Sequence, residues 1–203
     1  MIMALFGVSI ARRNFPIHGD GVYLRPAEMS DFVQWSSLRA RSRAFLTPWE
    51  PVWPLDDLTR SSFRYRVRRH GEELARDESF SFLIFREHDD TLVGGLSLGH
   101  VRRGVSQAAT LGYWMGEPHA GKGYMSRAVR AVLVYAFEKQ GLHRIEAACL
   151  PNNEPSKRLL ERLGFTQEGY ARAYLNINGQ WRDHLLFALL DTDPLPLRAP
   201  TLK

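Results

Sequence analysis

Hydrophobic residues along this chain recur with two different periods, and the change between them predicts the order of secondary structure. In the first third of the chain, Phe32, Trp35 and Leu38 are spaced as on one face of a helix. In the middle third, short apolar runs separated by turn residues are typical of antiparallel strands. A helical period returns at 126–140, where Gly141 supplies a C-terminal stop. The predicted elements are, in order, a strand at 22–25, helices around 32–38 and 59–75, strands at 80–85, 92–98 and 108–115, a helix at 126–140, a strand at 143–150, a helix at 153–163 and a hairpin turning at 178–179.

This order predicts a mixed α/β fold of the three-layer α+β kind, with a mostly antiparallel central sheet flanked by helices. Ser30 or Asp31 is placed to cap the first helix, and Asn153 is placed to cap the last. The aromatic, proline-rich stretch at 45–54 is expected to be a loop. No repeat or long linker divides the chain. We therefore expect a single domain, 1–203, with a core of about 20–190, an N-terminal extension 1–19 and a loose C-terminal tail 191–203.

Length and composition place the chain among ordinary globular proteins. With 203 residues, of which 44% are hydrophobic and 24% charged, it can bury a full-sized core. No apolar run approaches the ~20 residues that span a bilayer. The apolar opening at 1–10 is followed by its arginines instead of preceded by them, so we expect no signal peptide and a cytoplasmic protein. The single Cys149 excludes an internal disulfide and a multi-cysteine zinc site.

The formal net charge of +5 favours a polyanionic ligand or partner. A nucleotide-like cofactor fits this charge, and so does a ribosome or RNA surface. Five arginines lie in one predicted helical stretch, at Arg60, Arg64, Arg66, Arg68 and Arg69. A solvated basic helix face is the simpler explanation of this cluster, and nucleic-acid binding stays open beside it.

A glycine turn directly before the helix at 126–140 predicts a site for phosphate. Gly121 and Gly123 flank Lys122 at the helix N-terminus, where backbone N–H groups gather and the helix dipole favours an anion. A dinucleotide site would need a further glycine where Ser126 stands, and a nucleotide-triphosphate loop would need a hydroxyl directly after the lysine. A tight turn without ligand remains as the alternative.

A second motif follows the predicted strand at 143–150: Asn153, two residues later Pro155 and Ser156, then a short helix that ends in Leu163-Gly164-Phe165. Together with the glycine turn, this order resembles the acetyl-CoA-binding half of the GCN5-related N-acetyltransferases, the GNAT superfamily. That family has Gln or Arg three positions before its first glycine, where this chain has Pro118; we discount the departure because the turn binds through backbone donors. Longer segments within about 20–190 resemble the ribosomal-protein-alanine N-acetyltransferases of the same superfamily, at 45–52, 101–104, 111–113, 165–170 and 177–184.

The resemblance implies a GNAT fold whose sheet is splayed at the cofactor site, and direct attack of an amine on the thioester of acetyl-CoA, without a metal. The implied acceptor is the N-terminal α-amino group of Ala or Ser in a protein such as a small-subunit ribosomal protein, and the protein would be a monomer or homodimer. An α-amine suits such an enzyme because its pKa of about 7.7–8.0 leaves roughly a tenth of it neutral at pH 7. The residues expected to bind the cofactor are Tyr113, Trp114, Met115, His119, Ala120, Gly121, Lys122, Gly123, Tyr124, Met125, Asn153 and Ser156.

For catalysis, the resemblance places Ser156 near the sulfur of the departing coenzyme A as an acid, with helix capping as its alternative role. Glu50 and Glu146 are the candidates for a base, and a loop-capping carboxylate or a structural salt bridge is the alternative for each. A covalent role for Cys149 is less favoured than buried packing. The residues expected to bind the acceptor are Trp49, Glu50, Trp53, Tyr174 and Trp181.

Two other functions fit the same sequence. The chain could acetylate a small-molecule amine, because a shared fold does not determine the acceptor. It could also be a basic RNA- or ribosome-binding protein with a non-catalytic acetyltransferase fold, with arginines 60–69 and 102–103 contacting phosphate.

Overall fold

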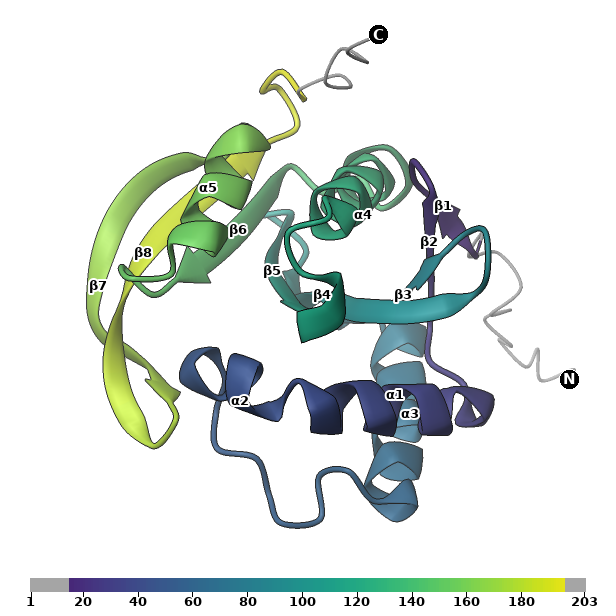
Figure 1. Cartoon of the computed structure of the whole chain (residues 1–203). Helices are drawn as coiled ribbons and strands as arrows, with labels where there is room; N and C mark the ends of the chain where they lie inside the picture. The colour runs from purple at the N-terminus through teal and green to yellow at the C-terminus, as the bar shows by residue number, and fades with distance from the viewer. Residues whose placement is uncertain (1–14, 196–203) are drawn as a thin grey trace, which may run out of the picture.

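The computed structural model describes residues 15–195, which form one eight-stranded sheet with helices on both faces (Figure 1). The strand order is β1-β2-β3-β4-β5-β6-β8-β7, and β5 and β6 are the parallel pair in an otherwise antiparallel sheet. The strands are β1 (Ile17–His18), β2 (Val22–Arg25), β3 (Phe80–Arg86), β4 (Thr91–Arg102), β5 (Ala108–Met115), β6 (Arg144–Cys149), β7 (Thr166–Ile177) and β8 (Gln180–Leu190). The helices are α1 (Phe32–Arg41), α2 (Arg43–Leu46), α3 (Arg60–Ala75), α4 (Tyr124–Val134) and α5 (Glu154–Arg162). The predicted three-layer fold with a mixed, mostly antiparallel sheet is confirmed.

Each face of the sheet has its own hydrophobic core, because side chains alternate between the two faces along every strand. Phe82 of β3 packs with Val129 of α4 and Leu160 of α5 in the larger core. Phe85 of the same strand lies in the second core, with Phe63 of α3 and with α1. Figure 1 shows the same division, with α4 and α5 on one side of the sheet and α1 and α3 on the other. We call these sides the α4 face and the α3 face.

The helix predicted at 126–140 forms, with different ends. It begins at Tyr124 because Gly123, in a left-handed conformation with φ of +78°, turns the chain into the helix. Its last turn is π-helical, over Tyr135–Lys139, and Gly141 stops it with φ of +62°. The first turn of the helix therefore directly follows the glycine turn.

Two predictions for the N-terminal half differ from the structure. Neither Ser30 nor Asp31 caps α1 through its side chain, because both carboxylate oxygens of Asp31 accept hydrogen bonds from Arg25, at 2.7 and 2.8 Å. The expected loop at 45–54 includes the end of α2 and a 3-10 turn at Thr47–Trp49. The cap prediction missed Arg25, which lies six residues before Asp31 and takes both of its oxygens.

The ends of the chain also differ from the expected boundaries. Strand β1 lies inside the expected N-terminal extension and pairs with β2 at Ile17↔Leu24. The apolar opening at 1–10 and most of the expected tail lie outside the described residues. Within residues 15–195, no helix has both the length and the apolar composition of a membrane span.

Candidate active site

Strands β5 and β6 are paired at one end and diverge at the other. Their register runs from Ala108↔Arg144 to Leu111↔Ala147 and then stops, although β5 stays paired with β4 up to Met115. Residues 112–115 therefore have an edge that no strand of the described residues, 15–195, covers. This is the splay that the resemblance implied, and an unpaired edge can accept an extended ligand as an added strand.

The glycine turn lies beside this opening, between β5 and α4. Gly121 and Gly123 have φ of +73° and +78°, a conformation in which a β-carbon is strained. A β-carbon at either position would meet nothing within 4 Å, so the turn requires glycine for its conformation and not for space inside the protein. No side chain caps the N-terminus of α4. Its first N–H groups are thus free of a side-chain partner and can hold an anion.

Two hydroxyl groups meet across the splay. The Tyr113 Oη of β5 and the Ser156 Oγ of α5 are 2.7 Å apart. Asn153 holds the serine in place, because its side-chain oxygen accepts the Ser156 N–H at 3.2 Å, as the predicted helix cap requires. Burial raises the pKa of Tyr113 to about 12, which outweighs the hydrogen bond with Ser156, so the phenol stays protonated at neutral pH. The sequence identified both residues, and the structure supplies their contact.

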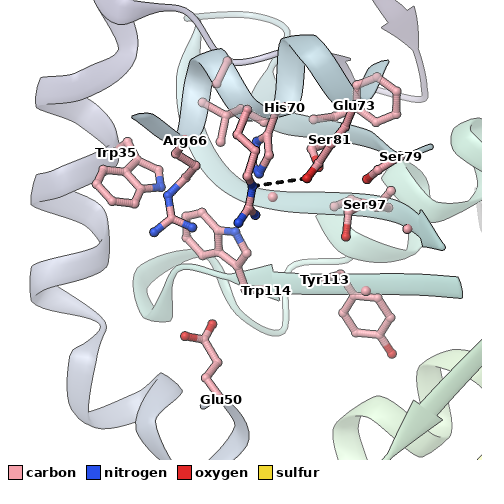
Figure 2. Close-up of a pocket in the computed structure, with 18 of the residues that line it drawn as sticks. Trp35, Glu50, Arg66, His70, Glu73, Ser79, Ser81, Ser97, Tyr113 and Trp114 are labelled. Atoms are coloured by element: carbon pink, nitrogen blue, oxygen red, sulfur yellow. Dashed lines mark ion pairs between the residues drawn. The ribbon is translucent and has the colours of Figure 1, made fainter. Parts of the chain in front are cut away.

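A cleft of about 890 Å³ opens on the α3 face, between α3, the loop at 50–54 and the sheet (Figure 2). Its lining includes Tyr113 and Trp114 of β5 and His100 and Val101 of β4. Its volume lies in the range of small-ligand and substrate sites. We call it the α3-face cleft. Its charged lining residues are Arg39, Glu50, Asp57, Arg66, Arg69, Glu73 and Glu78.

Glu50 lies in this cleft as the centre of a clamp. Its two carboxylate oxygens accept hydrogen bonds from Arg39, both at 2.7 Å, and one of them also accepts the Trp53 indole N–H at 2.7 Å. The Glu50 backbone oxygen accepts the Asn178 N–H at the tip of the β7–β8 hairpin. The Arg39 guanidinium is stacked 3.9 Å from the ring centroid of Trp53 and 4.9 Å from that of Trp114. These contacts favour the structural role of Glu50 over the predicted role as a base.

Glu146, the other predicted base, lies outside the α3-face cleft. It accepts hydrogen bonds from Arg102 at 2.6 Å and from Arg144 at 3.0 Å. Partial burial raises the pKa of Glu146, but these hydrogen bonds and charges outweigh it and hold the pKa below its ordinary value. A carboxylate so paired is a poor proton acceptor, which favours the salt-bridge alternative.

The predicted acceptor wall is only partly assembled. Trp53 and Glu50 line the α3-face cleft, whereas Trp49, Tyr174 and Trp181 do not, and Trp181 is 67% exposed. Because β7 and β8 form the far edge of the sheet, their outward side chains face solvent. The prediction that these three aromatics form walls does not hold for this cleft.

Cys149 is buried at the end of β6, and burial raises the pKa of its thiol. This suits packing and disfavours a nucleophile.

Most of the basic cluster on α3 is neutralised within the protein. Arg66 pairs with Asp57 at 2.7 Å, and Arg68 and Arg69 pair with acidic residues one turn along the helix, at 3.9 and 3.2 Å. Arg102 and Arg103 are likewise paired, the second with Asp77 at 2.6 Å. The predicted contacts of these arginines with nucleic acid thus gain no support from the structure.

Arg39, His70 and Ser97 are among the residues of the cleft that sequence reasoning missed. For Ser97 a signal existed, because Gly95, Ser97 and Gly99 alternate with large apolar residues along one strand. Such alternation marks a sheet face that no large side chain fills. For Arg39 and His70 the helical pattern predicted only a polar position and did not indicate that either residue faces a cleft.

Comparison with known proteins agrees with this geometry. Residues 22–166 match the model of the acetyltransferase (GNAT) domain family. The probable N-acetyltransferase YjcK of Bacillus subtilis (strain 168) is 40% identical over 87% of this chain and 98% of its own length. The [ribosomal protein uS5]-alanine N-acetyltransferase of Escherichia coli (strain K12) is 37% identical over 88% and 92%. The structure of Mycobacterium smegmatis RimJ in complex with CoA-disulfide superposes with a TM-score of 0.80 at 35% identity, over 84% of this chain and 82% of that one. The chain therefore belongs to the GNAT family of acetyltransferases.

Proposed function

We propose that this enzyme transfers the acetyl group of acetyl-CoA to the N-terminal α-amino group of a protein, at Ala or Ser, with a small-subunit ribosomal protein as the acceptor. The uncovered edge at 112–115 carries the proposal, because it lies between a phosphate-type turn and the α3-face cleft. The names of the relatives support it: one is a ribosomal-protein alanine acetyltransferase, and one was solved with CoA-disulfide.

The residues around the splay fit coenzyme A. The backbone of the turn at 121–123 and the first turn of α4 would hold the pyrophosphate, and the pantetheine arm would pair with the free edge of β5. The other residues that we assign to this binding site are Tyr113, Trp114, Met115, His119, Ala120, Lys122, Tyr124, Met125 and Asn153.

The chemistry then needs little more than positioning and one proton donor. The nitrogen lone pair of the acceptor attacks the thioester carbonyl carbon, the C–S bond breaks, and the thiolate takes a proton. A backbone N–H on the free edge can stabilise the oxyanion. Tyr113 and Ser156 share one hydrogen bond between two hydroxyls, which leaves one O–H hydrogen free to donate to the sulfur. We propose Ser156 as this donor, and it regains its proton through water from the acceptor nitrogen, which loses one proton as the amide forms.

The attacking amine of the acceptor must also lose a proton. Glu50 and Glu146 are both held by arginines, so we assign it to water in the cleft and not to either carboxylate. An α-amine permits this, because about a tenth of it is already neutral at pH 7, whereas a lysine side chain is well below ~0.1% neutral. The proposed acceptor thus agrees with the pairing of Glu50 and Glu146 by arginines.

The test is incubation with acetyl-CoA and a panel of peptides that differ in their N-terminal residue, read by mass spectrometry. Transfer to free Ala or Ser N-termini is expected, and peptides with a blocked N-terminus but a free lysine serve as the control. Transfer only to small amines would move the acceptor assignment to that class. Absence of any turnover, together with salt-dependent RNA binding, would reject the enzymatic proposal.

A further inference from the structure

The α3-face cleft owes its depth to an unusual stretch of the sheet. On this face, parts of β3, β4 and β5 and the residue before β3 present small residues, bounded by the large Leu83 and Trp114, whereas the opposite face carries large ones such as Leu96 and Leu98. The small residues are Ser79, Ser81, Gly95, Ser97, Gly99 and Gly112. Ser81 and Ser97 are direct partners in the β3–β4 register, and Ser97 and Gly112 are partners in the β4–β5 register. The result is a continuous floor across three strands.

The polar groups on this floor are not used by the protein. Within residues 15–195, the hydroxyls of Ser79, Ser81 and Ser97 and the ring of His70 have no hydrogen-bond partner. Figure 2 shows His70 of α3 opposite Ser81 and Ser97. Hydrogen-bonding groups that face a substrate cleft without partners are suited to a polar ligand.

Two strongly buried side chains of the cleft also have polar atoms without a partner in the described part of the chain. Arg39 is 8% exposed and Asp57 is 9% exposed, and both line the cleft. Among residues 15–195, the Arg39 Nε and the Asp57 Oδ2 find no hydrogen-bond partner, although the other polar atoms of each group are paired. A buried donor and a buried acceptor thus lie in the walls of the cleft without a partner among the residues that the structure describes.

His70 and the serines of the floor are uncharged, whereas the charged side chains of the cleft each have an ion-pair partner. Burial lowers the pKa of His70 to about 4, and repulsion from Arg69 and Arg66 adds to this, so the imidazole is neutral at pH 7. It then carries one donor and one acceptor, as do the serine hydroxyls. The charges that face His70 are Arg66, Arg69 and Glu73 from its own helix, Asp57 from the preceding loop and Glu78 before β3. Uncharged groups that both donate and accept are the complement of peptide amides.

We infer that this floor binds the peptide backbone of the acceptor beyond its first residue, over roughly residues two to four. The inference rests on the proposed function. The distance suits it: Ser81 lies two strands and two register positions from Trp114, on the order of 12 Å, which an extended chain covers in about three or four residues. The enzyme would therefore require an acceptor of minimum length and tolerate different side chains along it.

The experiment is a length series. Amidated peptides of one to six residues, all with the same N-terminal residue, are assayed at saturating acetyl-CoA. Two or three additional amide hydrogen bonds should raise kcat/KM by roughly tenfold to a hundredfold between one and four residues, with a plateau beyond. N-methylation of the second and third peptide bonds should remove most of that gain.

Gly99→Leu tests whether the acceptor backbone lies on this floor. A β-carbon at Gly99 meets nothing within 4 Å and has no positive φ, so the side chain should enter the floor without collision. The variant should lose the dependence on length and retain the activity on the shortest acceptor and the KM for acetyl-CoA. Gly71→Leu is the matched control, since Gly71 is an exposed glycine of α3 with the same open surroundings. Ser81→Ala with Ser97→Ala should give a smaller loss in the same direction. Ser37→Ala should give none, because Ser37 is an exposed serine of α1 that does not line the cleft.

The outcomes distinguish failure of the backbone-binding floor from failure of the proposed function. A flat length series with measurable transfer overturns this inference and leaves the proposed function standing. No transfer to any member of the series overturns the proposed function itself. A length dependence that survives Gly99→Leu places the acceptor elsewhere. A strong preference for Lys or Glu at positions two to four would mean that the enzyme recognises side-chain charge and not the backbone, and would also overturn the inference.

Discussion

Replacing Arg39 by Met should destabilise the protein, because it leaves the Glu50 carboxylate without its main partner. Arg39 is 8% exposed and donates to both oxygens of Glu50 at 2.7 Å. Its guanidinium also lies between Trp53 and Trp114. Methionine retains an unbranched apolar stem and removes the charge, so the effect reports on the ion pair more than on lost volume.

The magnitude follows from the environment of the carboxylate. Removing one partner of a fully buried ion pair costs about 3–5 kcal/mol. The Glu50 side chain is 19% exposed and keeps the hydrogen bond from Trp53, which reduces that loss to about 2 kcal/mol. Loss of the cation–π contacts adds about 0.5–1 kcal/mol. A total near 3 kcal/mol corresponds to a fall in Tm of about 6–12 °C for a protein of this size.

Urea denaturation of a double-mutant cycle measures the pair itself. With Arg39→Met and Glu50→Leu made singly and together, the double variant should be about 2 kcal/mol more stable than the sum of the singles predicts. Arg68→Met is the control, because Arg68 and Glu72 form an exposed pair at 3.9 Å. Its loss should stay below about 0.5 kcal/mol.

Two results would refute this reasoning. One is a loss below about 1 kcal/mol for Arg39→Met, and the other is additivity of the single changes. Kinetics give a second reading: the KM for the peptide should rise in Arg39→Met while the KM for acetyl-CoA stays constant. Glu50→Gln should leave the pH profile of kcat unchanged. If the acidic limb of that profile disappears in Glu50→Gln, Glu50 is the base.

Three further predictions concern other parts of the site. Gly121→Val with Gly123→Val should raise the KM for acetyl-CoA, because each valine strains a left-handed position by about 1–2 kcal/mol and obstructs the backbone donors; unchanged cofactor binding in a folded double variant would contradict the cradle. Ser156→Ala should lower kcat roughly tenfold to a hundredfold with a smaller change in the KM for acetyl-CoA, and Tyr113→Phe should lower kcat less; full activity of Ser156→Ala would leave that serine only its place in the helix cap. For His70 the pKa falls from 6.5 to about 4 in the fold, so protonation favours the unfolded chain and stability is lost as the pH drops from about 6.5 to 4. His70→Gln should lack about 2 kcal/mol of that loss, after allowance for partial solvent screening, in urea titrations at several pH values; parallel curves for the two proteins would count against the neutral imidazole.

Features that depend on neighbours in the chain were predictable from the sequence alone. The apolar period gave α4, the alternating runs gave β3 to β5, and the turn at 178–179 has the positive φ that its residues predicted, +47° and +78°. The Asn153 cap forms with Ser156, three residues away. Each of these rests on backbone conformation or on hydrogen bonds within one helical turn, so a short window of sequence contains the whole interaction.

The partners of the functional groups were decided by the tertiary structure. Tyr113 and Ser156 are 43 residues apart in the chain, and only the divergence of β5 and β6 brings their hydroxyls to 2.7 Å. For Glu50 and Glu146 the sequence left a catalytic base and a structural carboxylate open, and an arginine from another element holds each of them. A carboxylate becomes a base or a clamp according to what faces it, and strand register and helix packing determine that. The small residues of β4 were visible in the sequence, yet only the position of α3 above them makes them the floor of a cleft.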